Sequence, residues 1–350
     1  MENQILPTLR PLRLGELLDR AIRLYRANFL TFIGIIAVVY VPLMVLQTAA
    51  SALLSSSMLN MSGSSPQEIF TNYGYWIGVL GTFILLILEF ILVQGVAAGA
   101  LSRAVADNYL GKTVGILDAY RGIGKSWLRL VGIELLVWII SIGLVIWWLV
   151  PCIGWLTGLG MLMFLMGAIN PFVPPVVALE NQGVLDALRR AWSLARRRFW
   201  PVLGYVLVLA LFSWIIVSGP RLLVSVLLTQ LFQSFGDPTT QLVVTSLIQG
   251  FVSLVFALIY LPLQLTAFTL IYFDVRVRTE GFDLALVTLA TSDSPDLSTA
   301  MAAPVPSDER FITGAEIGNF AILTLAGAGI YIFFISFFMG SAMLFGSLWR

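Results

Sequence analysis

The sequence predicts an all-α integral membrane protein: a six-span helical body of three repeated units, followed by a seventh, C-terminal transmembrane helix. Of its 350 residues, 59% are hydrophobic and only 11% are charged, whereas a soluble domain has about 25% charged residues. Apolar runs long enough to cross a bilayer recur along the chain. A basic amphipathic segment of similar sequence precedes every second span of the body.

Seven apolar runs are long enough to be spans. They are Phe29–Leu54, Tyr75–Ala104, Leu130–Val150, Trp155–Leu179, Val202–Leu228, Val243–Phe273 and Phe320–Leu348. Several exceed the length that a bilayer requires, so we expect tilted or kinked helices, with Pro42, Pro220 and Pro262 as break points.

The basic residues determine the predicted orientation. Eighteen of the 20 Lys and Arg residues lie on one side of these spans, and the exceptions are Arg221 and Arg350. Because basic loops stay in the cytoplasm, the N-terminus is expected there. With seven spans, the C-terminus is expected on the extracytoplasmic side of the cell membrane.

Composition divides the chain into three parts. Residues 1–290 form the predicted six-span membrane domain. Residues 291–315 are rich in Ser, Pro, Asp and Ala and read as a flexible cytoplasmic linker. Residues 316–350 form the predicted C-terminal transmembrane helix, whose glycines permit close approach to another helix. This helix is otherwise an ordinary membrane anchor.

The three repeated units begin with LGELLDRAIRLYRANFLTFIG, VGILDAYRGIGKSWLRLVG and QGVLDALRRAWSLARRRFWPVLG. Each segment has a Leu-Asp pair followed, three or four positions later, by a basic residue. That spacing puts both charges on one helical face, where they can form ion pairs. The expected interfacial pairs are Asp19 with Arg23, Asp118 with Arg121, and Asp186 with Arg189 and Arg190.

The third segment shows the clearest amphipathic pattern. Its predicted apolar stripe is Leu185, Leu188, Trp192, Ala195 and Phe199. Arg189 and Arg190 are assigned to the opposite, polar face. Such helices lie in the membrane interface with the apolar face toward lipid. Anionic lipid headgroups are therefore candidate partners, although basic amphipathic connectors are also expected for orientation alone.

The sequence limits the available chemistry. It contains no histidine and one cysteine, Cys152, so the usual general base, the commonest metal ligand and any intrachain disulfide are excluded. We predict no catalytic residue, metal or cofactor and expect the chain not to be an enzyme. A site made only of carboxylates remains open.

Five polar residues within the spans are candidates for an intramembrane polar layer: Gln94, Asn170, Gln264, Glu89 and Glu134. The three amides come out roughly 14–15 Å from the cytoplasmic boundary, each in the second span of its unit. The two glutamates differ in depth by more than roughly 10 Å, so they should not share a proton or metal. Interhelical hydrogen bonding is the preferred role, and a polar pocket or proton relay is the alternative.

The run LIYFDVRVRTEGFDLAL at Leu270–Leu286 resembles the end of the membrane domain family named after glycerophosphoryl diester phosphodiesterases. The segments LGELLDRAIRLYRANF and VALENQGVLDALRRAW are similar to that family's other two blocks. The resemblance implies a six-span body, found alone in many bacterial inner-membrane proteins. The family's catalytic domain, a soluble barrel with catalytic histidines, has no counterpart here, so phosphodiesterase activity is not expected.

Four charged residues of this run, Asp274, Arg276, Arg278 and Glu280, lie just past a span. We expect them to form a local ion-pair network that pins the helix end to the interface, rather than to bind a ligand.

These observations favour a non-catalytic scaffold, regulatory protein or complex subunit. The expected partners are membrane lipids and other membrane proteins that bind the C-terminal helix, and no nucleic acid. A lipid or small-solute transporter with a mid-membrane polar site is the alternative.

Overall fold

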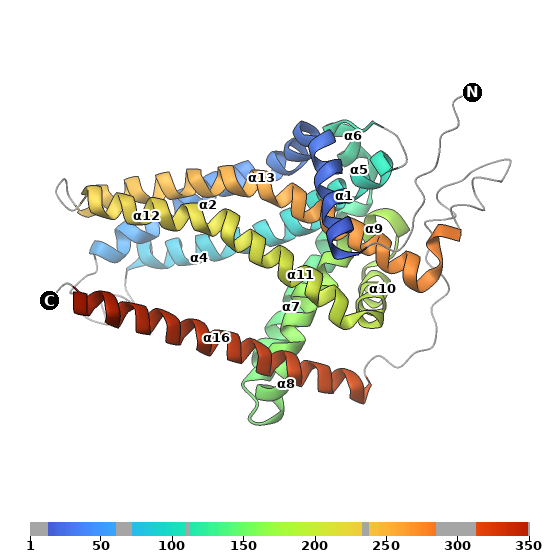
Figure 1. Cartoon of the computed structure of the whole chain (residues 1–350). Helices are drawn as coiled ribbons and strands as arrows, with labels where there is room; N and C mark the ends of the chain where they lie inside the picture. Colours follow the sequence, from blue (N-terminus) through green and yellow to red (C-terminus); the bar gives the residue numbers. More distant parts are fainter. Residues whose placement is uncertain (1–12, 61–71, 110–112, 233–237, 285–312, 349–350) are drawn as a thin grey trace. The chain divides into compact units, whose positions relative to one another are not determined.

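A computed structural model describes residues 13–60, 72–109, 113–232, 238–284 and 313–348, and in these ranges the chain forms helices and no strands (Figure 1). Six stretches of the described residues are long and apolar enough to cross a membrane: Phe29–Ser55, Tyr73–Asn108, Ser126–Trp148, Ile153–Glu180, Phe199–Leu228 and Val243–Glu280. The predicted all-α, multi-pass membrane fold is confirmed.

The last helix, α16 (Gly314–Leu348), is continuous over 35 residues. Its apolar stretch Gly314–Ile330 is shorter than the six spans, and a membrane crossing by α16 stays a prediction. Residues 285–312, which include most of the predicted linker, lie outside the described residues.

The chain forms two compact units, residues 1–134 with 171–302 and residues 135–170 with 303–350. The first unit contains α1 (Leu14–Ala27), α2 (Phe29–Asn60), α4 (Tyr73–Glu89), η1 (Phe90–Ala97), α5 (Ala98–Tyr109), α6 (Ile116–Ile123), α9 (Val173–Glu180), α10 (Val184–Arg197), α11 (Phe199–Ser213), η4 (Trp214–Ser218), α12 (Gly219–Phe232) and α13 (Pro238–Glu280). The second contains α8 (Ile153–Phe164), η2 (Leu165–Ile169) and α16, and the division falls within α7 (Ser126–Trp148).

One of the three predicted break points lies beside a change in the helical hydrogen-bond pattern. Pro42 and Pro262 sit inside α2 and α13, which continue as α-helices through them, whereas Pro220 is the second residue of α12 and follows η4. The π-helical segments η1, η2 and η4 interrupt three of the spans. Such segments insert an extra residue into a helical turn and shift the register of every later side chain.

The three amphipathic segments are helices, and the first and third end in nearly the same way. Asn28 closes α1 with φ −122° and ψ 29°, and Arg198 closes α10 with φ −132° and ψ 49°. A phenylalanine, Phe29 or Phe199, then begins the next span. The second copy turns at Gly124, where φ is +50° and glycine has no Cβ to strain.

Each amphipathic helix packs against the second span of the unit before it, and α1 packs against the last span. The contacts join α6 to α5, α10 to α9, and α1 to α13. The first two pairs are neighbours along the chain, whereas α1 and α13 are not. The Tyr25 hydroxyl secures this closing contact by donating a hydrogen bond to the Ile259 carbonyl oxygen, 2.8 Å away.

The buried face of α10 differs from the predicted apolar stripe. Small side chains, including Ala187 and Ala191, are fully buried, whereas Leu185 is 60% exposed. The stripe was predicted to face lipid, and its other members differ from Leu185: Ala195 is fully buried and Phe199 is 6% exposed. Small side chains allow close contact between helices in a membrane protein, while large apolar ones can face lipid.

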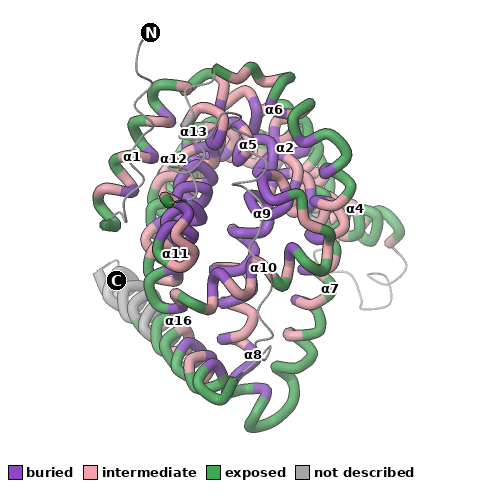
Figure 2. The backbone as a smooth tube through the Cα atoms, turned by 90° about the vertical axis from the view of Figure 1, so that its right-hand side faces the viewer, coloured by how far each residue is buried: buried purple, intermediate pink, exposed green. Residues whose placement is uncertain are grey.

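The centre of the first unit is formed by the ends of the three second spans. Helix α5 contacts both α9 and α13, and Figure 2 shows α9 buried along almost its whole length. The Ser102 and Thr269 hydroxyls, on α5 and α13, form a buried hydrogen bond of 3.1 Å. A cluster of buried charged side chains, described below, lies at this end of the bundle.

In the second unit, α16 packs closely on α8. The Gly160 amide donates a 2.8 Å hydrogen bond to the Thr324 Oγ1 atom, and a Cβ at Gly160 would lie 2.0 Å from the Phe320 carbonyl oxygen. The glycine that permits this approach therefore belongs to α8. Of the glycines expected to act in the last helix, Gly327 contacts Met163 and Gly329 faces open space.

Candidate functional site

Five side chains gather where α9, α10 and α13 meet, and we call them the Glu180 cluster: Glu180, Arg190, Tyr272, Arg276 and Glu280. Glu180 is the last residue of α9, and Arg190 lies on α10. The other three share one face of the last turns of α13, because their spacing is four residues. The four charged side chains are at most 10% exposed.

Arg190 lies between the two glutamates. Its Nε atom is 2.9 Å from Glu180 Oε2, and its Nη2 atom is 3.1 Å from Glu180 Oε1 and 2.7 Å from Glu280 Oε2. Burial alone lowers the pKa of Arg190, but the hydrogen bonds and charges of Glu280 and Glu180 outweigh it. The pKa is therefore raised above its ordinary value, and the guanidinium stays charged.

Tyr272 and Arg276 complete the cluster. The Tyr272 hydroxyl donates a 2.6 Å hydrogen bond to Glu180 Oε1 and accepts one of 3.0 Å from Arg276 Nη1. Arg276 Nε lies 3.1 Å from Glu280 Oε2, and the guanidinium carbon lies 4.5 Å from the centre of the Phe282 ring. Each carboxylate is thus shared by both arginines.

Two positive and two negative charges balance within the cluster, and their hydrogen bonds point toward one another. A balanced, internally bonded network holds helices in place and offers little to a ligand. Within the described ranges, no three His, Cys, Asp or Glu side chains come together as metal ligands.

The structure places Arg276 with Glu280, as above, and Arg278 with Asp274 at 2.8 Å. Neither Glu180 nor Tyr272 was singled out from the sequence as a partner of these arginines. The sequence pattern also assigned Arg190 to the solvent-facing side, which the buried contacts of Arg190 contradict. The four-residue spacing of Tyr272, Arg276 and Glu280 was the sequence feature that could have indicated their contact, because it places them on one face of a helix.

The predicted interfacial pairs are weaker. Asp118 and Arg121 are 4.0 Å apart, and Asp186 and Arg189 are 3.9 Å apart, with each side chain at least 67% exposed. Exposed pairs contribute little because water screens them.

The pairing of Asp19 with Arg23 stays a prediction. Both side chains are exposed, and the energy that would hold two long side chains together in water is small.

The candidate polar residues of the membrane interior do not share one environment. Glu134 is fully buried, and neither of its carboxylate oxygens has a hydrogen-bond partner among the described residues. It packs against Gly95 in η1, where a Cβ would lie 2.8 Å from Glu134 Cγ. Glu89 is partly exposed and lies within electrostatic range of Tyr40.

The amides also differ from one another. Gln94, in η1, and Gln264, in α13, are half-buried. Asn170 is 6% exposed, and its Oδ1 atom has no partner among the described residues. These side chains do not present one uniformly exposed layer.

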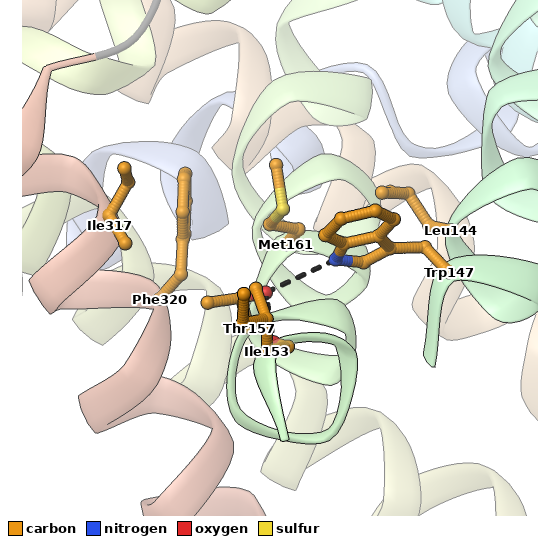
Figure 3. A pocket seen from close by; sticks show the side chains of 7 residues that line it. All are labelled: Leu144, Trp147, Ile153, Thr157, Met161, Ile317 and Phe320. Carbon is orange, nitrogen blue, oxygen red and sulfur yellow. Dashed lines mark hydrogen bonds between the residues drawn. The ribbon is translucent and has the colours of Figure 1, made fainter. Parts of the chain in front are cut away.

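The second unit has an apolar pocket of about 360 Å³, shown in Figure 3. It is lined by Leu144, Trp147, Ile153, Thr157, Met161, Ile317 and Phe320. Its polar feature is the Trp147 indole, which donates a 3.2 Å hydrogen bond to Thr157 Oγ1. Because its polar groups bind each other, the pocket presents an almost wholly apolar lining.

Residues 75–275, more than half of the chain, match the family described as "Domain of unknown function (DUF7847)". The chain belongs to this family. The matched region includes Glu180, Arg190 and Tyr272 of the Glu180 cluster and ends just before Arg276. No curated protein and no solved structure matches the chain. This match does not link the chain to the membrane domain family named after glycerophosphoryl diester phosphodiesterases, so that resemblance stays a prediction.

Proposed function

We propose that this family member is a non-catalytic membrane protein that serves as a scaffold, regulatory protein or complex subunit. The Glu180 cluster is the main support. It concentrates the buried charges of the first unit, yet its arginines and glutamates bind one another. Charges that satisfy one another fix the relative positions of α9, α10 and α13 and leave no reactive group aimed at a substrate.

The kinship with the phosphodiesterase-associated membrane domain belongs to this proposal. Tyr272, Arg276 and Glu280, which lie in the resembling run, are also three of the five cluster residues. A motif whose residues hold helices together fits a membrane domain that accompanies other proteins or domains. We also propose that the protein lies in a bacterial inner membrane, with its arginine-rich side on the cytoplasmic face.

The test is to extract the tagged full chain with its native lipids and to weigh the particle by native mass spectrometry. We expect a stoichiometric second protein, and we expect deletion of residues 320–350 to release it if α16 is the contact. A full-length chain that carries no protein partner in native membranes, with or without chemical cross-linking, would argue against the proposal.

Transport of a proton or small solute is the second candidate, and Glu134 is the observation that favours it. A fully buried carboxyl with two unpartnered oxygens is costly inside a membrane and is a functional candidate by default. In proteoliposomes, pH-gradient dissipation by the wild type but not by Glu134→Gln would support transport. Equal fluxes for both proteins, at the level of empty liposomes, would argue against transport and favour the scaffold role.

A further inference from the structure

A basic pocket lies at the ends of two spans in the first unit. It has a volume of about 510 Å³ and is lined by Arg196, Arg197, Arg198, Phe199, Trp200, Pro201 and Thr279. The candidate span of α11 begins at Phe199, and that of α13 ends at Glu280, one residue after Thr279. The pocket therefore lies at the membrane–water boundary.

The repeat shows that the fold does not require three arginines here. In the first unit, the residues before the span are Arg26, Ala27 and Asn28, and Asn28 has nearly the backbone conformation of Arg198. The second unit has Gly124, Lys125 and Ser126 in this place. Since the same junction forms with Ala and Asn, the additional arginines at 197 and 198 have a role beyond closing the helix.

Orientation in the membrane does not explain the position of these arginines either. Positive-inside bias counts charges in a loop and is indifferent to where their side chains point. Arg196, Arg197 and Arg198 instead line one hollow, together with a threonine from α13, which is far away in the sequence. Several arginines that line one hollow are typical of a phosphate-binding site, because guanidinium groups bind phosphate through paired N–H groups.

Trp200 indicates which phosphate compound fits. It lines the pocket, is 47% exposed, and is the second residue of its span. Exposed tryptophans at span ends lie at the level of lipid headgroups, with the ring against the upper acyl chains. A ligand that occupies the pocket beside this ring has both a phosphate and a hydrocarbon part.

We propose that the pocket formed by Arg196, Arg197, Arg198 and Trp200 is a binding site for the phosphate group of an anionic phospholipid. The arginines hold the phosphate, and Trp200 packs beside the start of the acyl chains. The site anchors the start of α11 to one lipid molecule, in addition to the general attraction of the basic surface to the membrane.

The test is native mass spectrometry of the full chain, released from phosphatidylcholine nanodiscs that contain increasing fractions of phosphatidylglycerol. We expect one phosphatidylglycerol molecule to bind more tightly than the others. The variant Arg197→Ala/Arg198→Asn copies the first unit's junction, which this fold already accommodates. Each arginine near an anionic membrane contributes on the order of five-fold in affinity, so the variant should weaken the tightest binding by about 25-fold.

The matched control is Arg23→Gln/Arg26→Gln, which also removes two charges, both from exposed arginines of α1. It should weaken the tightest binding by less than about five-fold, the contribution of a single arginine, because neither Arg23 nor Arg26 lines the pocket. Equal losses in both variants would reduce the effect to general surface charge and overturn the proposal.

A second arm distinguishes lipid phosphate from a soluble phosphate compound. Millimolar inorganic phosphate should not displace the tightest phosphatidylglycerol from the wild-type protein. Displacement by inorganic phosphate, or a lack of preference for phosphatidylglycerol over phosphatidylcholine, would reject a phospholipid as the ligand.

Discussion

Two hydrogen bonds join Arg190 to Glu180, from Nε to Oε2 at 2.9 Å and from Nη2 to Oε1 at 3.1 Å. The paired geometry connects the end of α9 to the middle of α10. Arg190 contacts both Glu180 and Glu280, so its loss leaves two buried carboxylates with one counter-charge, that of Arg276.

Replacement Arg190→Gln should lower the free energy of unfolding by about 3–5 kcal/mol, because it leaves buried carboxylates without their main counter-charge. The neighbouring Arg189→Gln, which changes a 71% exposed side chain, should cost less than about 1 kcal/mol. Unfolding by SDS in mixed micelles would measure both. Similar losses for the two variants would show that the cluster does not hold the helices.

Replacement Gly95→Ala should be destabilising by about 1–3 kcal/mol, because the new Cβ would lie 2.8 Å from Glu134 Cγ. A second change, Glu134→Ala, removes the clashing atom and should restore part of the loss. Gly81→Ala is the control, since a Cβ there meets nothing within 4 Å. Absence of coupling between positions 95 and 134 in a double-mutant cycle would contradict this packing.

Replacement Tyr25→Phe removes the hydrogen bond to Ile259 and should cost about 1 kcal/mol. Burial raises the pKa of Tyr25 to about 12, above the ordinary value of about 10. The tyrosine therefore contributes fully below pH 10, and its contribution is lost as the pH rises through 12. The stability difference between wild type and variant, followed from pH 8 upward, should shrink in that window; a constant difference would be inconsistent with the bond.

Replacement Gly160→Ala should separate α16 from α8, because the new Cβ would come within 2.0 Å of the Phe320 carbonyl oxygen. The backbone oxygen has no rotamer by which to move away. With the exposed Cys152 first replaced by serine, the variant Thr324→Cys, at a position that is 6% exposed, should react with a maleimide much faster when Gly160→Ala is also present. Unchanged labelling would mean that α16 does not pack there.

Sequence patterns predicted the six spans because length and hydropathy are properties of one segment at a time. Adjacent arginines show where this fails. Arg189 is exposed and Arg190 is buried, although both follow the same Leu-Asp pair. Their environments depend on which face of α10 packs inward. That face is formed mainly by small residues such as Ala187 and Ala191, together with Leu194, whereas Leu185 is exposed, so large apolar side chains alone do not identify it.

The Glu180 cluster was only partly predictable for a related reason. Arg276 and Glu280 are four residues apart on one helix, so local spacing indicates their contact. Glu180 and Glu280 are 100 positions apart and meet through Arg190, which requires the packing of three helices to be known. Glu134 was recognisable as unusual, but its contact with Gly95 depends on the register shift of η1.

The contact between α1 and α13 sets an order on biosynthesis. A ribosome makes α1 long before α13, so the partner that receives Tyr25 does not exist when the first span enters the membrane. The first amphipathic helix must wait at the membrane surface, while α6 and α10 can dock on spans that immediately precede them. The α1–α13 contact can form only after α13 has been made, and a chain interrupted before α13 would present an undocked α1 to quality-control proteases.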